Sequence, residues 1–343
     1  MKPSSESNAC PTEGNSRRDF LQKIGAMAAA APLASNAAAA PSMPMVRFGN
    51  HKLSRLIIGC NTLGGGSHLS RMIDLEMRAW NTPERLLADF KHASELGINC
   101  VESPRPQLVQ QVNEFLGPGK MMFTARGYAR LPEYESGGRR PWRTPQEIAK
   151  SGCIAIHHVG AGEPGTDAWW RMGRLEKVRD FCKMVRDTGV LVAVTSHLPQ
   201  VFTEIESQGW DVDYYMTCLY KYGRTPEEWK KAFASNPGMM PAELFHSKEE
   251  ASPHYGGETA FAAGDPPEMY KVIKQTKKPC FVYKLLASGR LCEKPEFVEA
   301  VFKECFANIK RTDTVVVGMW TKQEDQYAIN AEYVRRFGQV SET

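Results

Sequence analysis

Histidine and serine side chains follow two apolar runs that are predicted to be β-strands. The first run contains His157 and His158, and the second ends in Ser196 and His197. Imidazole transfers protons near neutral pH and also binds divalent metals, and a neighbouring hydroxyl can orient it. These residue types predict acid–base chemistry or metal binding at the ends of both runs.

The segment between the two runs is predicted to place their polar ends side by side. From Leu175 to Val185 the apolar residues follow a helical spacing, and Gly189 follows as a common helix-ending residue. A strand, a helix and a second strand within this short stretch form a βαβ unit with parallel strands. Both polar ends then lie at the carboxyl edge of one sheet, where parallel α/β folds carry their chemistry.

The rest of the chain repeats this unit. Eight apolar runs alternate with eight helical patterns over residues 46–338, which predicts a (β/α)8 TIM barrel within the α/β class. The predicted strands are 55–61, 98–103, 121–127, 153–162, 190–197, 213–220, 280–289 and 314–319. The stretch 221–265 is longer than one crossover needs, and we interpret it as an insertion.

The amino terminus has the pattern of an export signal. Ser16–Lys23 reads SRRDFLQK, a twin-arginine motif, and an apolar run and a small-residue site before Pro41 follow. We expect residues 1–40 to be a twin-arginine signal peptide that directs the folded protein through that export machinery, in bacteria to the periplasm. A disordered basic tail beside an alanine-rich linker is the alternative.

Composition excludes several classes of function. The formal net charge is +4, too mild for a nucleic-acid or membrane-surface binder. The apolar run after the twin arginines is too short to span a membrane. None of the nine cysteines forms a CxxC pair, so we expect buried free thiols and no zinc–cysteine cluster.

Five motifs in chain order resemble the aldo-keto reductase family across nearly the whole predicted barrel. They are FGNHKLSRLIIGCNTLGG, HASELGINCVESP, VAVTSH, KLLASGRL and VVVGM, the last followed by Asn330. The resemblance implies a hairpin before the first strand, a (β/α)8 barrel, and reduction of a carbonyl by a nicotinamide cofactor.

The resemblance also implies catalytic positions. The family's aspartate falls on Glu102, its lysine on Arg126, and its histidine on His157 or His158, of which we favour His158 because it lies nearer the loop. Its tyrosine falls on Gln107, which cannot supply a phenol's proton. The tyrosines that could replace it are Tyr128, Tyr134 and Tyr255.

The cofactor positions that the resemblance implies lie in the second half of the chain. Ser196 falls where the family contacts the nicotinamide carboxamide, and Tyr220 where a ring stacks on the nicotinamide. The pyrophosphate loop falls on Leu285 to Arg290, with Leu285, Ala287, Ser288, Gly289 and Arg290 as cofactor-binding residues, and Lys284 directly before it is a further cofactor-binding position. Asn330 falls at the adenosine end, with Thr321, Lys322 and Gln326 nearby. NAD and NADP both remain open.

Three functions are compatible with these residues. The first is an exported oxidoreductase that acts on a carbonyl or sugar substrate with a tightly held nicotinamide cofactor. The second is a metal-dependent isomerase or lyase that uses Glu102, His158 and His197 as ligands. The third is a non-catalytic binding protein on the same barrel.

Overall fold

The structure is a computed structural model that describes residues 42–129, 143–162, 164–225, 227–228 and 261–340. The chain divides after Ala40 into two units, and the barrel lies in the second. The predicted signal peptide, Tyr134, Tyr255 and most of the predicted insertion lie outside the described residues.

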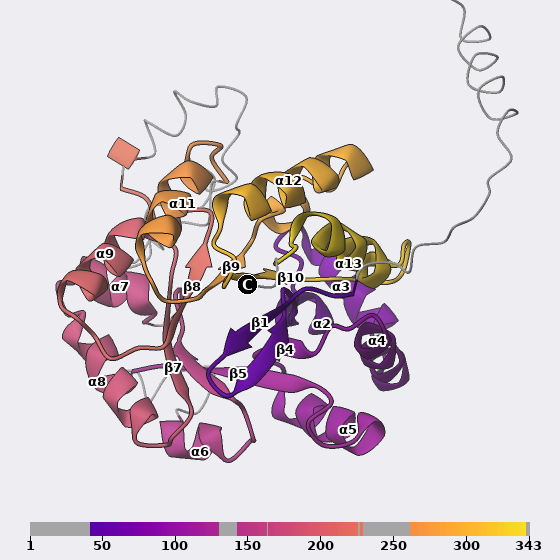
Figure 1. Cartoon of the computed structure of the whole chain (residues 1–343), viewed down its shortest axis with the longest axis horizontal. Helices are drawn as coiled ribbons and strands as arrows, with labels where there is room; N and C mark the ends of the chain where they lie inside the picture. Colours follow the sequence, from indigo (N-terminus) through magenta and orange to yellow (C-terminus); the bar gives the residue numbers. More distant parts are fainter. Residues whose placement is uncertain (1–41, 130–142, 163, 226, 229–260, 341–343) are drawn as a thin grey trace, which may run out of the picture. The chain divides into compact units, whose positions relative to one another are not determined.

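Eight parallel strands close into a barrel, which confirms the predicted (β/α)8 TIM fold (Figure 1). The strands are β3 (Leu56–Gly59), β4 (Cys100–Glu102), β5 (Met122–Gly127), β6 (Ala155–His158), β7 (Leu191–Ser196), β8 (Tyr214–Cys218), β9 (Cys280–Tyr283) and β10 (Thr314–Val317). They pair in chain order, and β10 closes the barrel by pairing with β3. Because all strands run the same way, their carboxyl ends meet at one rim.

Helices surround the strands, and one follows each strand in the described chain (Figure 1). These helices are α4 (Pro83–Glu95), α5 (Pro106–Leu116), α6 (Pro145–Ala149), α8 (Glu176–Arg186), α9 (Pro199–Ser207), α11 (Asp265–Gln275), α12 (Pro295–Asn308) and α13 (Gln326–Phe337). Helix α8 buries Val178, Phe181, Cys182 and Val185 against the barrel, as the apolar spacing predicts.

Short helices after β3 and β6 are features that the sequence patterns did not predict. After β3 the chain forms α2 (Cys60–Leu63) and α3 (Arg71–Trp80), and after β6 it forms α7 (Thr166–Arg171). Both loops leave the carboxyl ends of their strands, so α3 and α7 lie at the rim where barrel enzymes carry their sites.

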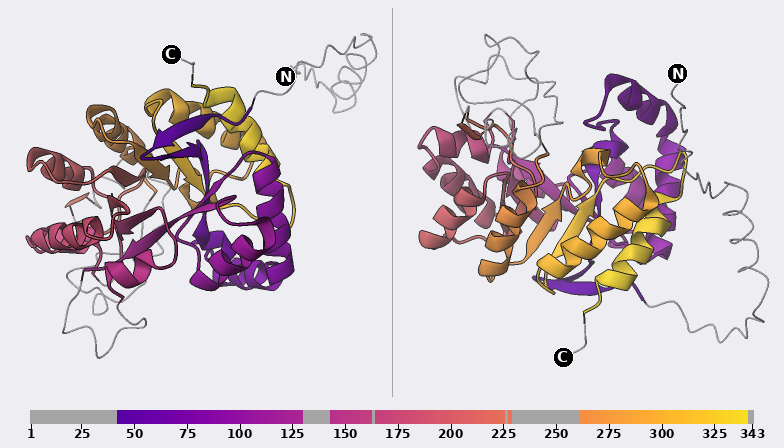
Figure 2. Two further views of the ribbon diagram at one scale, coloured as in Figure 1. Left: turned by 60° about the horizontal axis from the view of Figure 1, so that its bottom comes forward. Right: turned by 90° about the horizontal axis from the view of Figure 1, so that it is seen from above.

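An antiparallel hairpin, β1 (Met45–Phe48) and β2 (His51–Ser54), precedes the barrel, as the resemblance implies. Phe48 packs on Tyr214 and Phe281 inside the barrel, with ring centroids 4.8 and 4.9 Å apart. The hairpin therefore closes the amino end of the barrel, and α3 lies at the opposite end (Figure 2).

Two expectations from composition can be compared with the described residues. The eight cysteines among these residues are free thiols; six are buried as predicted, whereas Cys60 is half-buried and Cys292 is exposed. Among the same residues, no helix is both long enough and apolar enough to cross a bilayer.

Candidate functional site

A group of polar side chains surrounds Glu102 at the carboxyl rim. The Cys60 thiol donates a hydrogen bond to Oε2 of Glu102 at 3.2 Å, and Nε2 of His157 lies 3.5 Å from Oε1. The guanidinium of Arg126 lies 3.6 Å from the sulfur of Cys60. The structure thus brings Glu102 and Arg126 together, as predicted, but with His157 as their histidine. We call these four residues the Glu102 cluster.

Electrostatics keep the Glu102 carboxylate ionised. Burial raises its pKa, but the protonated form of His157, the guanidinium of Arg126 and hydrogen bonds from Ser103 and Cys60 together outweigh that effect and hold the pKa below its usual value. Burial lowers the pKa of His157 to about 4, so its imidazole is neutral near pH 7. The cluster therefore holds a carboxylate next to the permanent positive charge of Arg126.

The expectation that His158 faces the site is wrong. Nε2 of His158 accepts a hydrogen bond from the Ala129 N–H at 2.9 Å, and its ring packs edge-on against Phe181 of α8. Adjacent strand residues point to opposite faces, so His157 enters the barrel and His158 faces the helices. His158 is a packing histidine.

A second cluster lies at the ends of β7 and β9. Nδ1 of His197 lies 2.6 Å from Oδ2 of Asp167, and its Nε2 lies 3.0 Å from the phenol oxygen of Tyr283. Oδ1 of Asp167 accepts hydrogen bonds from the Ser196 hydroxyl at 2.5 Å and from the His197 N–H at 3.2 Å. These contacts fix the carboxylate and the ring, and we call Asp167, His197 and Tyr283 the relay.

The relay has a defined protonation pattern. Burial disfavours the charged form of His197, but Cys218 and Asp167 together raise its pKa to about 9. Burial raises the pKa of Tyr283 well above its usual value, and the negative charges of Asp167 and Glu102 act in the same direction. Near pH 7 the imidazole is therefore charged and the phenol protonated. Glu102 ends β4 and Tyr283 ends β9, so both clusters lie at the carboxyl rim of the same barrel.

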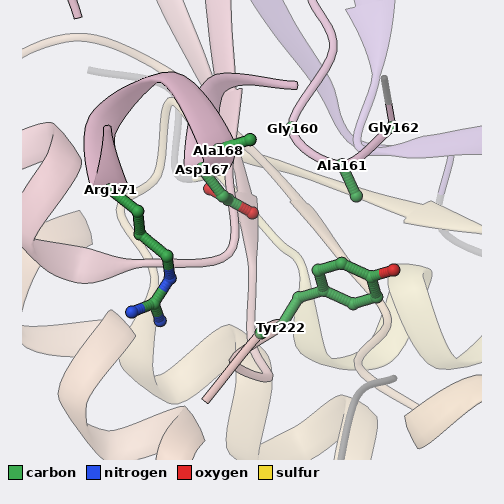
Figure 3. A pocket seen from close by; sticks show the side chains of 8 residues that line it. Gly160, Ala161, Gly162, Asp167, Ala168, Arg171 and Tyr222 are labelled. Carbon is green, nitrogen blue, oxygen red and sulfur yellow. The ribbon is translucent and has the colours of Figure 1, made fainter. Parts of the chain in front are cut away.

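A small pocket adjoins the relay. Asp167 and Arg171 project from α7, Tyr222 lies across from them, and the loop Gly160–Gly162 forms another wall (Figure 3). The Tyr222 ring centroid lies 5.4 Å from that of His197. A Cβ atom on Gly160 would lie 3.1 Å from the His197 ring, so glycine allows this loop to approach the relay closely.

Backbone strain occurs directly after both site strands. Ser103, next to Glu102, has φ 44°, and Lys284, next to Tyr283, has φ 62°. The left-handed region is unfavourable for residues other than glycine, and such residues concentrate at functional sites. This strain supports the carboxyl ends of β4 and β9 as parts of one site.

The predicted contacts to nicotinamide do not fit the structure. The Ser196 side chain is fully buried, and its hydroxyl is used to hold Asp167. Tyr220 is 5% exposed and packs on Phe261, with ring centroids 5.2 Å apart, among the side chains between sheet and helices. A nicotinamide ring therefore cannot reach either residue. Tyr222, two residues later, is half-buried and lines the small pocket instead.

The predicted pyrophosphate loop is closed by its own hydrogen bonds. The N–H groups of Ala287, Gly289 and Arg290 donate to carbonyls within the loop. Arg290 bonds to the His68 carbonyl at 3.1 Å and lies over Phe261, and Lys284 lies over the same ring. Leu285 and Ala287 are buried, and Ser288 and Gly289 have positive φ. These donors are not arranged for a phosphate, contrary to the expectation.

The remaining predicted ligands are also placed elsewhere. Asn330 is buried on the inner face of α13. Glu102, His158 and His197 do not form the predicted metal site, because His158 faces away from the barrel interior. Within the described ranges, no group of three or more His, Cys, Asp or Glu side chains is arranged to hold a metal ion.

Sequence patterns missed Cys60, Asp167, Tyr222 and Tyr283. Tyr283 is the last residue of β9, so its position at a strand end was a usable signal. Asp167 is the second residue of a short helix after the glycine-rich loop that follows β6, a position with no distinctive pattern.

Comparisons with known proteins give only distant structural likenesses. No protein-family model matches the chain, and no curated protein matches it. A truncated 3-deoxy-D-arabino-heptulosonate 7-phosphate synthase from Thermotoga maritima is 12% identical, with a TM-score of 0.44 over 86% of this chain and 91% of that chain. The N-acetylmannosamine-6-phosphate 2-epimerase from Clostridium perfringens is 16% identical, with a TM-score of 0.39 over 69% and 80%.

Proposed function

We propose that this protein is a barrel enzyme that moves protons at a carbonyl group and its neighbouring carbon in a small hydroxylated substrate, such as a sugar. One observation carries the proposal: the relay ends in a protonated phenol, and the ionised carboxylate of Glu102 lies at the same rim of the barrel. An acid and a base at one barrel rim suit isomerisation, epimerisation or carbon–carbon cleavage next to a carbonyl.

The relay supplies the acid. Asp167 accepts the Nδ1–H of His197, and the charged imidazole donates its Nε2–H to the phenol oxygen. The O–H of Tyr283 is then left to donate to a substrate oxygen. When the phenol loses this proton, His197 replaces it, so a free phenolate does not accumulate. Proton transfer of this kind contributes about 100-fold to 10,000-fold to a rate.

The Glu102 cluster supplies the base and a positive charge. The carboxylate takes the proton from the carbon next to the carbonyl, and Arg126 stabilises the negative oxygen that develops. Cys60 and His157 hold the two carboxylate oxygens. Groups preorganised in this way stabilise a transition state without reorganising during the reaction.

Reduction with nicotinamide, which the resemblance implies, uses the same acid but needs a bound hydride donor. The misfit of Ser196, Tyr220 and the loop 284–290 counts against that cofactor, so we derive no hydride step. Glu102, Arg126 and His157 stand at catalytic positions that the resemblance implies, and they lie in one cluster. For this reason the test below includes reduction as a possible outcome.

Hydrogen exchange tests the proposal. The full chain is incubated in D2O with a panel of aldoses, ketoses and their phosphates. Proton NMR follows loss of the signal from the carbon next to the carbonyl, which is C2–H in aldoses and C1–H or C3–H in ketoses. We expect exchange with the natural sequence and a loss of about 100-fold or more in Tyr283→Phe and in Glu102→Gln. Tyr220→Phe is the matched control, because that phenol lies outside the site.

Parallel titrations with NADH and NADPH, followed by fluorescence, decide between a proton-transferring enzyme, a reductase and a binding protein. Exchange without nicotinamide binding supports the proposal. Nicotinamide binding with oxidation of the reduced ring and no exchange overturns it in favour of a reductase. Substrate binding without any conversion overturns it in favour of a binding protein.

A further inference from the structure

We propose that the buried ion pair between Arg224 and Asp265 positions Tyr222 against His197, so that Tyr222 selects the substrate that reaches the relay. The inference rests on the proposed function for its kinetic consequence, but its geometric part can be tested alone. Arg224 and Asp265 are positioning residues, because neither touches the relay.

Three contacts fix the segment 221–224, which follows β8. Arg224 donates to the Lys221 carbonyl at 2.9 Å and forms an ion pair with Oδ2 of Asp265. The Lys221 N–H donates to the same Oδ2 at 3.1 Å. The side chains of Arg224 and Asp265 are only 2% and 9% exposed. The first turn of α11 thus holds both ends of the segment 221–224.

Tyr222 lies between the tied residues. Gly223 has φ 67°, a left-handed turn that glycine adopts without strain, and it directs the chain from Tyr222 back to Arg224. The ring planes of Tyr222 and His197 are inclined by 41°. The ring thereby stands at the pocket that Asp167 also lines (Figure 3).

The contacts of Arg224 with the Lys221 carbonyl and with Asp265 require an arginine side chain. A planar guanidinium can donate to a carbonyl and a carboxylate at once in a fixed geometry, whereas an ammonium acts as a compact point charge. The ring that it positions offers an aromatic face beside a proton-transferring group. Such a face suits the C–H side of a sugar-like ring whose oxygens turn toward the relay.

Paired apolar substitutions test the tie. Arg224→Met with Asp265→Leu removes both charges together, because removing one leaves a costly unpaired buried charge. The matched control is Lys221→Met with Glu268→Leu, which removes a second ion pair in the same part of the chain. In that pair the Lys221 nitrogen lies 2.7 Å from a Glu268 oxygen, and the two side chains are 13% and 40% exposed. Tyr222→Ala removes the ring itself.

The first readout needs no activity. In the histidine-labelled full chain, NMR records the ring proton of His197, which Tyr222 shifts by its ring current. We expect Tyr222→Ala and the Arg224/Asp265 pair to move this resonance in the same direction, and the control pair to leave it in place. If the paired variant does not fold, Arg224→Lys is expected to give a smaller shift in that direction. An unchanged resonance in a folded Arg224/Asp265 variant, or in Tyr222→Ala, overturns the inference.

The second readout separates positioning from chemistry. A misplacement of about 1 Å lowers kcat/KM by up to about 100-fold. We expect the Arg224/Asp265 pair to show its loss mainly as a higher KM, with the alkaline limb of the pH profile unchanged. Tyr283→Phe should abolish exchange while Tyr222 still shifts the His197 resonance, so failure of the proposed function and failure of this inference are distinguishable.

Discussion

The phenol oxygen of Tyr283 lies 3.0 Å from Nε2 of His197, although 86 residues separate them in the sequence. Asp167 holds the opposite nitrogen of the same ring at 2.6 Å. One carboxylate thus orients the imidazole that serves the phenol and favours its charged form. The predictions below follow from this arrangement and from the Glu102 cluster at the same rim.

Asp167→Asn should uncouple the relay. An amide no longer stabilises the charged imidazole, so the pKa of His197 falls from its raised value and less acid is present at neutral pH. We expect turnover at pH 7 to fall by about 100-fold or more. We also expect the alkaline limb of the pH–rate profile to move to lower pH. Asp211→Asn is the control, because Asp211 is an exposed partner of Arg186 outside the relay. An alkaline limb that does not move in Asp167→Asn would refute the relay.

Stability should be greatest near pH 6.5. Between pH 6.5 and about 9 the folded chain keeps the proton on His197, whereas the unfolded chain releases it. The stabilisation from His197 is therefore fully present below pH 6.5 and is lost as the pH rises through about 9. His157 has a folded-state pKa of about 4, so the unfolded chain binds more protons between pH 4 and 6.5, and stability falls as pH decreases.

Each histidine should contribute about 3 kcal/mol across its window, because one pKa unit corresponds to about 1.4 kcal/mol. Urea unfolding at several pH values measures the profile. His197→Gln should flatten the alkaline limb. His157→Gln should make the acid limb less steep without removing it, because burial also lowers the pKa of His158, to about 3. His92→Gln, 40% exposed on α4, is the control. A steep alkaline limb that persists in His197→Gln would contradict this assignment.

Arg126→Ala should remove the positive charge beside Glu102. We expect turnover to fall by about 100-fold or more, as when one preorganised donor is lost. Gln107→Ala should cost much less, because Gln107 is exposed on α5 although it stands at the tyrosine position of the resembled family. Equal losses in the two variants, measured with the same substrate, would argue against a catalytic role for Arg126.

Arg17→Lys together with Arg18→Lys should retain the precursor in the cytoplasm. The twin-arginine pattern and the apolar run after it motivate this prediction, which concerns residues outside the described structure. Fractionation of cells that express the tagged full chain measures it, with Lys2→Arg as the control. Normal export of the double variant would refute the proposed route.

The alternation of apolar runs and helical patterns determined the barrel, because each βαβ unit can bury its apolar faces only against its neighbours. Strand ends placed Glu102 and Arg126 at one rim, and the structure confirms that they lie in one cluster. For these residues, position along a strand was sufficient information.

Only the tertiary structure decided which of His157 and His158 points into the barrel. All four residues of β6 are buried, because a barrel strand packs on side chains within and on helices outside. Its sequence therefore carries no polar alternation to show that His157 points inward and His158 outward. The relay was hidden for a related reason: Asp167 and Tyr283 reach His197 from a short helix and a distant strand, and only closure of the barrel brings those elements together.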